Sequence, residues 1–184
     1  VNRPGYTAQA VNLANTAGGS AQRYVRGTWA GSDNFTVSFW MNPQTVNGTN
    51  QYLFSAYNAN IAVYLRPSNV LAYQCPTGGS YTIIETSNTI VPNTWYYTTI
   101  IFQTNGSCSL YLNNNLSGSI INTQGFGSYT SSGFFGLGTL DSGTTLAFNG
   151  LIADLKIHNS AVPYVPIPLL APNIWLPFEN SVAD

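Results

Sequence analysis

The chain has 184 residues, of which five are basic, six are acidic and only 6% carry charge. This length predicts one domain with a single core. The weak and balanced charge, with no basic cluster, excludes binding of nucleic acid through phosphate neutralisation, and no apolar run is long enough to span a bilayer as a helix. Asn, Ser and Thr supply 57 positions, so the surface is covered by neutral polar groups. Such a surface indicates a protein that is packed in an assembly, glycosylated or exposed outside cells, or else a compositional bias of the source genome.

Alternation of apolar and polar residues with a period of two dominates the chain, and helical periodicity is nearly absent. In the first clear strand, Asn34 to Pro43, four apolar side chains fall on one face, namely Phe35, Val37, Phe39 and Met41. Further strands are expected, in order, over 51–57, 61–66, 70–75, 81–85, 95–102, 109–113, 116–121, 133–138 and 146–158. Residues 95–102 are apolar or aromatic on both faces, which predicts a central strand, and Asn114 predicts a tight hairpin. Short strands separated by regular turn signals are typical of an all-β sandwich.

Four strings in this order carry a family resemblance: NFTVSFWMNP (34–43), NTWYYTTIIF (93–102), SLYLNNNLSG (109–118) and FNGLIADLKIHN (148–159). In type and spacing they resemble strands of the laminin-G-like, concanavalin A-like domains, over about residues 8 to 160. The resemblance implies an antiparallel jelly-roll β-sandwich of two packed sheets. It also implies a binding role, above all for sugars, since only some branches of that family are enzymes.

We therefore expect the sandwich to occupy residues 1–160 and a proline-rich strap to follow over 161–172. The last segment, NIWLPFENSVAD (173–184), resembles the opening strand of the same family. It either completes this sandwich, as in a circular permutation, or opens a following repeat of a longer parent.

Catalysis is not expected. Glucanases on this scaffold use a Glu-x-Asp-x-x-Glu cluster on one strand, because glycoside hydrolysis needs two carboxyl groups at a fixed separation. The acids here are scattered and form no such motif: Asp33, Glu85, Asp141, Asp154, Glu179 and Asp184. His158 is the only histidine, so we expect a packed ring at the end of a strand rather than a catalytic base.

Cys75 and Cys108 lie near predicted strand ends. Either they form a disulfide that closes a loop of 33 residues or both are free buried thiols. The sequence leaves the two alternatives open.

Many relatives of this kind hold calcium at the rim through aspartates and loop carbonyls. No cofactor is required by the sequence, and the candidate calcium ligands are Asp33 and Asp141, both in predicted loops. Asp154 stands where the family has Glu, but the family's neighbouring Asp is replaced by Ala153, a departure that weakens the metal prediction.

Sugar binding needs aromatic platforms for pyranose faces and neutral amides or hydroxyls for the sugar hydroxyl groups. Trp40 is predicted on the face of its strand opposite the core residues, where it could line a groove. The other candidates lie in or beside loops: Trp29, Tyr57, Asn58, Tyr81 and Tyr129.

Two function hypotheses follow. The first is a non-catalytic, lectin-like adhesion module that binds glycans or glycoproteins on a cell or matrix surface. The second is a structural or assembly module of a virion or fibre, whose neutral surface is buried against neighbouring subunits. Both imply a location outside cells or on a virion surface.

Overall fold

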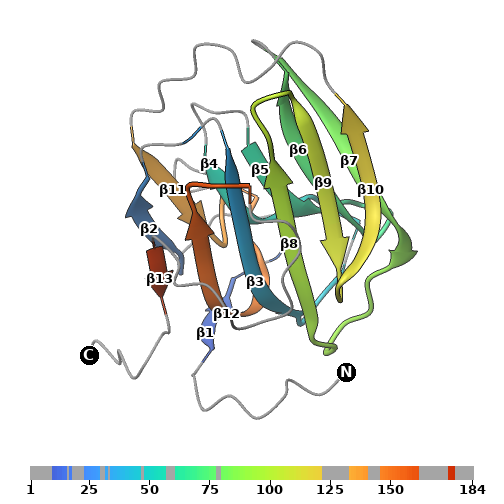
Figure 1. Ribbon diagram of the computed structural model, residues 1–184. Coiled ribbons are helices and arrows are strands. Elements are labelled where there is room, and N and C mark those ends of the chain that lie inside the picture. The colour runs from blue at the N-terminus through green and yellow to red at the C-terminus, as the bar shows by residue number, and fades with distance from the viewer. Residues whose placement is uncertain are drawn as a thin grey trace.

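The computed structural model describes residues 10–15, 17, 23–29, 32, 34–46, 48–56, 61–77, 80–121, 133–140 and 146–161, and the backbone of 174–176. Two antiparallel sheets pack face to face (Figure 1). Sheet A has the order β1 (Val11–Ala14), β12 (Asn149–His158), β3 (Phe35–Pro43), β8 (Tyr96–Phe102), β9 (Ser107–Leu112), β10 (Asn115–Ile121), with β13 (Ile174–Leu176) also paired to β12. Sheet B has the order β2 (Val25–Thr28), β11 (Phe134–Leu137), β4 (Gln51–Ala56), β5 (Ile61–Leu65), β6 (Val70–Thr77), β7 (Ser80–Thr89). The predicted all-β jelly-roll sandwich is confirmed.

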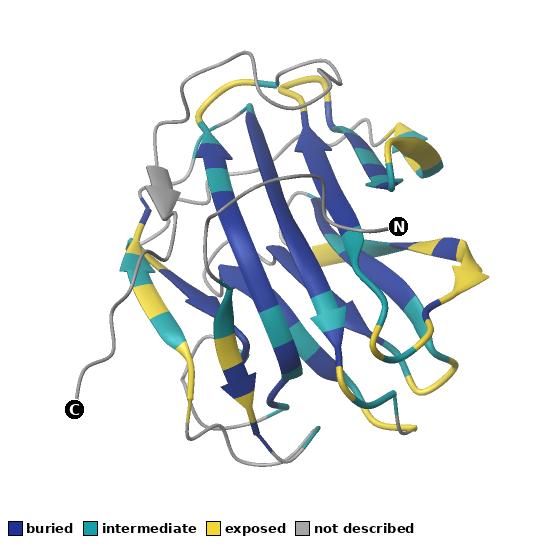
Figure 2. Cartoon of the chain, turned by 90° about the horizontal axis from the view of Figure 1, so that it is seen from below, coloured by how far each residue is buried: buried dark blue, intermediate teal, exposed yellow. Residues whose placement is uncertain are grey.

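β3 and β8 form the centre of sheet A, a position that the sequence predicts for β8. The four predicted core residues of β3, from Phe35 to Met41, are fully buried against sheet B. β8 is buried on both faces over almost its whole length, and Figure 2 shows these central strands in dark blue. Strands of this kind are covered on each side, which explains why β8 lacks the alternation of a half-exposed strand.

Aromatic rings from both sheets form the interior. Phe35 of β3 stacks on Phe102 of β8 with ring centroids 5.4 Å apart, and Phe54 of β4 stacks on Phe135 of β11 at 5.7 Å. Because successive residues of a strand point to opposite faces, these inward rings also determine which residues of each strand point away from the core.

The hairpin between β9 and β10 is formed as predicted, with one addition. Both turn residues, Asn113 and Asn114, have positive φ angles, of 49° and 73°. This is the requirement of a two-residue type I′ turn, for which asparagine is well suited.

Some elements were not expected from the sequence. β1 and β2 have four residues each and no strong alternating pattern, and β7 continues to Thr89, beyond the predicted end at Glu85. The strap predicted over 161–172 lies outside the described residues except for residue 161. Ile174–Leu176 pairs antiparallel with β12, on the same edge of β12 as β1. The domain boundaries proposed from the sequence remain a prediction.

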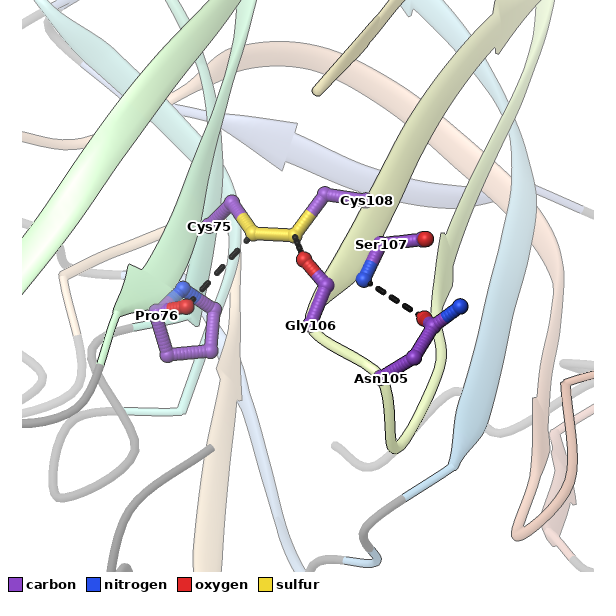
Figure 3. Close-up of a disulfide and its surroundings, with 6 residues drawn as sticks. All are labelled: Cys75, Pro76, Asn105, Gly106, Ser107 and Cys108. Carbon is purple, nitrogen blue, oxygen red and sulfur yellow. Dashed lines mark hydrogen bonds between the residues drawn. A yellow bond between two sulfur atoms is a disulfide. The ribbon is translucent and has the colours of Figure 1, made fainter. Parts of the chain in front are cut away.

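Cys75 and Cys108 form a disulfide that joins β6 of sheet B to β9 of sheet A (Figure 3). Their Cα atoms are 6.4 Å apart, within the range that a disulfide bridges. The alternative of two free thiols is therefore wrong. The bond links the two layers directly, beside the turn in which Ser107 N–H donates to Asn105 Oδ1 at 2.9 Å.

Opening the disulfide should destabilise the fold without changing its topology. The disulfide closes a loop of 33 residues, and its removal increases the conformational entropy of the unfolded chain. The double variant Cys75→Ala/Cys108→Ala should therefore lose about 3–4 kcal/mol of unfolding free energy. Urea unfolding followed by tryptophan fluorescence measures this loss. The wild-type protein under reducing conditions serves as the matched control and should lose a similar amount. Equal stability of all three samples would contradict the prediction.

Candidate functional site

The outer face of sheet A is closed around Trp40. This side chain does point away from the core residues of β3, as predicted, but it is only 6% exposed. Its ring packs against Tyr97 of β8 with centroids 5.1 Å apart and against Ala153 of β12. The prediction that Trp40 lines an open groove is therefore wrong, because a second small apolar cluster covers this face.

A buried ion pair closes the same face next to Trp40. β12 has an irregularity in its pairing with β3 between Ala153 and Lys156, and Asp154 within it has a φ angle of 54°. Asp154 is 2% exposed, and its Oδ2 lies 2.8 Å from Lys156 Nζ. Burial and the nearby Lys156 charge lower the pKa of His158, whose ring is partly buried at the end of β12, as predicted for a packed ring. Asp154 is thus a paired structural carboxylate.

Trp29 is a core residue and not a loop platform. It is 4% exposed, and its ring meets Phe35 edge to face with centroids 5.2 Å apart. Its Nε1–H donates to Asn159 Oδ1 at 2.9 Å, which satisfies the one polar atom of the ring. Trp29 does follow the end of β2, as predicted for a loop residue, but the prediction of an exposed ring is wrong because the side chain turns into the core.

The outer face of sheet B carries tyrosines of different exposure: Tyr64 is 5% exposed, Tyr52 is partly buried and Tyr81 is half-exposed. In β4 the pairing with β5 shifts between Tyr52 and Phe54, so that one extra residue, Leu53, is accommodated. Leu53 and Phe54 are both fully buried in the core, and Tyr52 lies opposite Tyr64 of β5, outside the core. A β-bulge of this kind re-aims the side chains that precede it.

Tyr52 and Tyr64 stack with ring centroids 4.8 Å apart and an angle of 12° between their planes. Both rings pack with Ala62 of β5 and Ala72 of β6, whose short side chains are fully covered, and with Ile83 of β7. Three neighbouring strands thus support one flat aromatic pair. We call Tyr52, Tyr64 and Tyr81 the tyrosine face.

Tyr81 of β7 completes the tyrosine face and is 49% exposed, in agreement with its prediction as a surface aromatic. Burial raises the pKa of Tyr64 to about 12, and the neighbouring Tyr52 and Tyr81 phenols contribute to the rise. Burial, and then Tyr81, also raise the pKa of Tyr52. Tyr81 lies two residues before Ile83 on β7, so its side chain projects from the same face of the sheet.

Polar groups surround the tyrosine face. Arg66 at the end of β5 forms an ion pair with Glu85 of β7, and each side chain remains about 40% exposed. Gln74 of β6 lies between Ala62 and Ile83 in the register of the sheet. The arrangement offers apolar ring surface together with phenol, amide, guanidinium and carboxylate groups for hydrogen bonding.

Other predicted site residues lie outside the described part of the chain, and their roles stay predictions. These are Tyr57, Asn58 and Tyr129 for the ligand, and Asp33 and Asp141 for calcium. Among the described residues, no group of three or more His, Cys, Asp or Glu side chains could hold a metal ion. The described residues also contain no helix able to cross a membrane.

Comparison with known proteins places the chain in a family. Residues 13–163 match the concanavalin A-like lectin/glucanases superfamily. The chain belongs to this superfamily. No protein of curated function matches the sequence.

Solved structures share the fold at low sequence identity. A heptameric SAP-like pentraxin from Limulus polyphemus is 17% identical, with a TM-score of 0.64 over 84% of this chain and 76% of the pentraxin. The CBM40 of the Ruminococcus gnavus IT-sialidase, bound to α2,3-sialyllactose, is 11% identical, with a TM-score of 0.63 over 84% of this chain and 92% of that domain. A putative carbohydrate-binding protein from Bacteroides ovatus is 15% identical, with a TM-score of 0.62 over 80% of this chain but only 44% of that protein.

The raised pKa of Tyr64 predicts a pH dependence of stability. The folded state holds the phenol proton more tightly than the unfolded state, whose pKa is near 10. This contribution to stability is complete below pH 10 and is lost as the pH rises toward 12. Absorbance titration at alkaline pH should show a phenol that ionises at about 12 and is absent from Tyr64→Phe. An unchanged titration curve in that variant would contradict the assignment.

Proposed function

We propose that the protein is a non-catalytic, lectin-like module that binds glycans through the outer face of sheet B. The observation that carries the proposal is the 49% exposed ring of Tyr81 together with the partly buried Tyr52, whose ring is held by stacking on the buried Tyr64. Aromatic rings held in this way need no reorganisation to receive the apolar face of a pyranose.

The chemistry around the tyrosine face supports the same ligand class. Phenol, amide and guanidinium groups can exchange hydrogen bonds with sugar hydroxyl groups, and the Arg66–Glu85 pair is exposed enough to take part. Membership of a superfamily that includes lectins favours glycans over other ligands. The CBM40 of the sialidase, a structural neighbour, carries a bound sialyllactose.

The acidic residues described on this face agree with a binding role without catalysis. Hydrolysis of a glycosidic bond needs a pair of carboxyl groups that flank the bond, one on each side. Among the described residues, Glu85 is the carboxylate next to the tyrosine face, and it is paired with Arg66. We expect no cofactor to be required, with calcium at Asp33 and Asp141 as the exception to test.

The Cys75–Cys108 disulfide supports a location outside the reducing cytosol, because such bonds persist in oxidising compartments. An extracellular or virion surface meets this condition. It also agrees with a surface that carries so little charge.

Truncation of the tyrosine face should weaken glycan binding. A glycan array identifies a ligand, and isothermal titration calorimetry then compares Tyr81→Ala with the wild-type protein. We expect binding about tenfold weaker, on the order of 1.4 kcal/mol, because a ring that contacts the sugar is lost. The matched control is Tyr111→Ala on β9 of sheet A, which should bind normally.

Two results would count against this site. Equal losses in the two variants would show that the tyrosine face is not the contact surface. Loss of binding on addition of a chelator would move the site to the predicted calcium ligands, Asp33 and Asp141.

An assembly module is the second candidate, favoured by one observation on β10. This strand forms an edge of sheet A, has no charged residue, and carries two exposed apolar side chains, Leu116 at 56% and Ile121 at 78% exposure. Edge strands of monomeric proteins are usually protected by charge or proline, since their free backbone groups can pair with another strand.

If β10 mediates assembly, the wild-type protein should self-associate in a concentration-dependent way and Leu116→Lys should remain monomeric. The introduced charge opposes pairing of strands at this edge. Sedimentation velocity distinguishes the monomer from the self-associated form. Val91→Lys alters another exposed apolar residue, 54% exposed and outside β10, and should behave as the wild-type protein does. A monomeric wild-type protein at high concentration would exclude assembly through β10.

A further inference from the structure

The described residues include few charged side chains, and only some of these form ion pairs. Arg66 pairs with Glu85, and Lys156 pairs with Asp154. Within the described ranges, Arg23 and Arg26 at β2 have no carboxylate partner. Among the described residues, no carboxylate therefore offsets the positive charge of β2 through an ion pair.

Arg26 belongs to the same face of sheet B as the tyrosine face. In the register of β2 and β11, Val25 lies opposite the core residue Leu137 and Gly27 lies over the ring of Phe135. The alternate residues Tyr24, Arg26 and Thr28 therefore point away from the core. Tyr24 is 44% exposed.

Phe134 of β11 holds the Arg26 guanidinium in place. Arg26 lies directly opposite Gly136, which has no side chain to obstruct it, and its Cζ is 4.1 Å from the centroid of the Phe134 ring. Phe134 is 49% exposed, so the guanidinium and the ring lie together at the surface. A guanidinium stacked on a ring keeps its in-plane N–H groups free to donate to a planar or tetrahedral anion.

The geometry points to an anion-binding subsite formed by Arg26 and Phe134. We infer that the glycans bound by this protein are acidic ones, with a carboxylate or a sulfate ester that the Arg26 N–H groups bind. This inference rests on the proposed function for the identity of the ligand. The subsite makes the proposed function more specific, because the tyrosine face alone does not distinguish neutral from acidic sugars.

The position of the subsite also sets a minimum length for the ligand. β11 lies between β2 and β4, so Arg26 and Tyr52 are two strand spacings apart, about 10 Å across the sheet. The strand residue in line with Arg26 and Gly136 is Ser55, three positions along β4 from Tyr52. A single sugar ring is too short to contact both, so an acidic oligosaccharide is the expected ligand.

Nitrogen-15 NMR of the full chain tests the subsite directly. The arginine Nε–Hε resonances are followed during titration with methyl glucuronide, glucose 6-sulfate and the neutral methyl glucoside. We expect the Arg26 resonance to shift in a saturable way with one or both acidic sugars and to stay in place with the neutral one. Arg26→Lys, which removes the resonance and so assigns it, should bind the acidic sugars more weakly, because a lysine lacks the planar donor pair.

The matched variants separate a specific site from general attraction. Arg26→Gln should weaken binding of the acidic sugars about tenfold, whereas Arg23→Gln, which removes the same charge three residues away, should change it by less than about twofold. Equal effects of the two variants, or an Arg26 resonance that no acidic sugar shifts, would overturn the subsite.

The same titrations keep the two proposals apart. Amide shifts around Tyr52, Tyr64 and Tyr81 with the neutral glucoside, without any response of Arg26 to the acids, would leave glycan binding intact and reject the subsite. A response of Arg26 to the acids, with no sugar shifting the tyrosine face, would support the subsite and reject the tyrosine face. A response to only one of the two acids supports the subsite and identifies the anion.

Discussion

The contact between the inward aromatic rings of the two sheets is the constraint on which the rest of the structure depends. Phe35 stacks on Phe102 within sheet A and Phe54 stacks on Phe135 within sheet B. Trp29, directly after β2 of sheet B, meets Phe35 of sheet A edge to face and so joins the two layers. Because a strand has only two faces, each inward ring also assigns its neighbours to the outside. The positions of Phe134 and Arg26 on the outer face of sheet B follow from that assignment, and the bulge at Leu53 places Tyr52 on the same face. The disulfide between β6 and β9 then ties the two layers together covalently.

The sequence predicted the strands well wherever the apolar pattern is long and clear, whether alternating or continuous. The ten-residue string that contains β3 has the expected core residues, and β8 has the continuous apolar pattern of a covered central strand. The hairpin at Asn113 and Asn114 was visible because positive φ angles favour asparagine. Short strands such as β1 and β2 have too few residues to show a period, so only their pairing with β12 and β11 reveals them.

The candidate site was harder to predict, for physical reasons that differ between residues. Tyr52 and Tyr64 were not recognised because strict alternation places Tyr52 and Phe54 on one face of β4. The bulge at Leu53 separates them, and bulges have no reliable sequence signal. Trp40 was misjudged for the opposite reason. Its face was predicted correctly, but alternation does not reveal what packs on that face, here Tyr97 and Ala153. Tyr81 is the one described candidate that the sequence placed on the surface correctly.

The lectin-like and assembly proposals do not compete for the same surface. The tyrosine face and Arg26 lie on the outer face of sheet B, whereas β10 is an edge of sheet A. Pairing of β10 with another strand would extend sheet A within its own plane and leave the outer face of sheet B open. A multimer formed in this way would present several tyrosine faces at once. Individual sugar contacts are weak, and linking several of them raises the overall affinity without any new contact. The neutral edge and the aromatic face would then serve a single function, in which assembly supplies the avidity that one domain lacks.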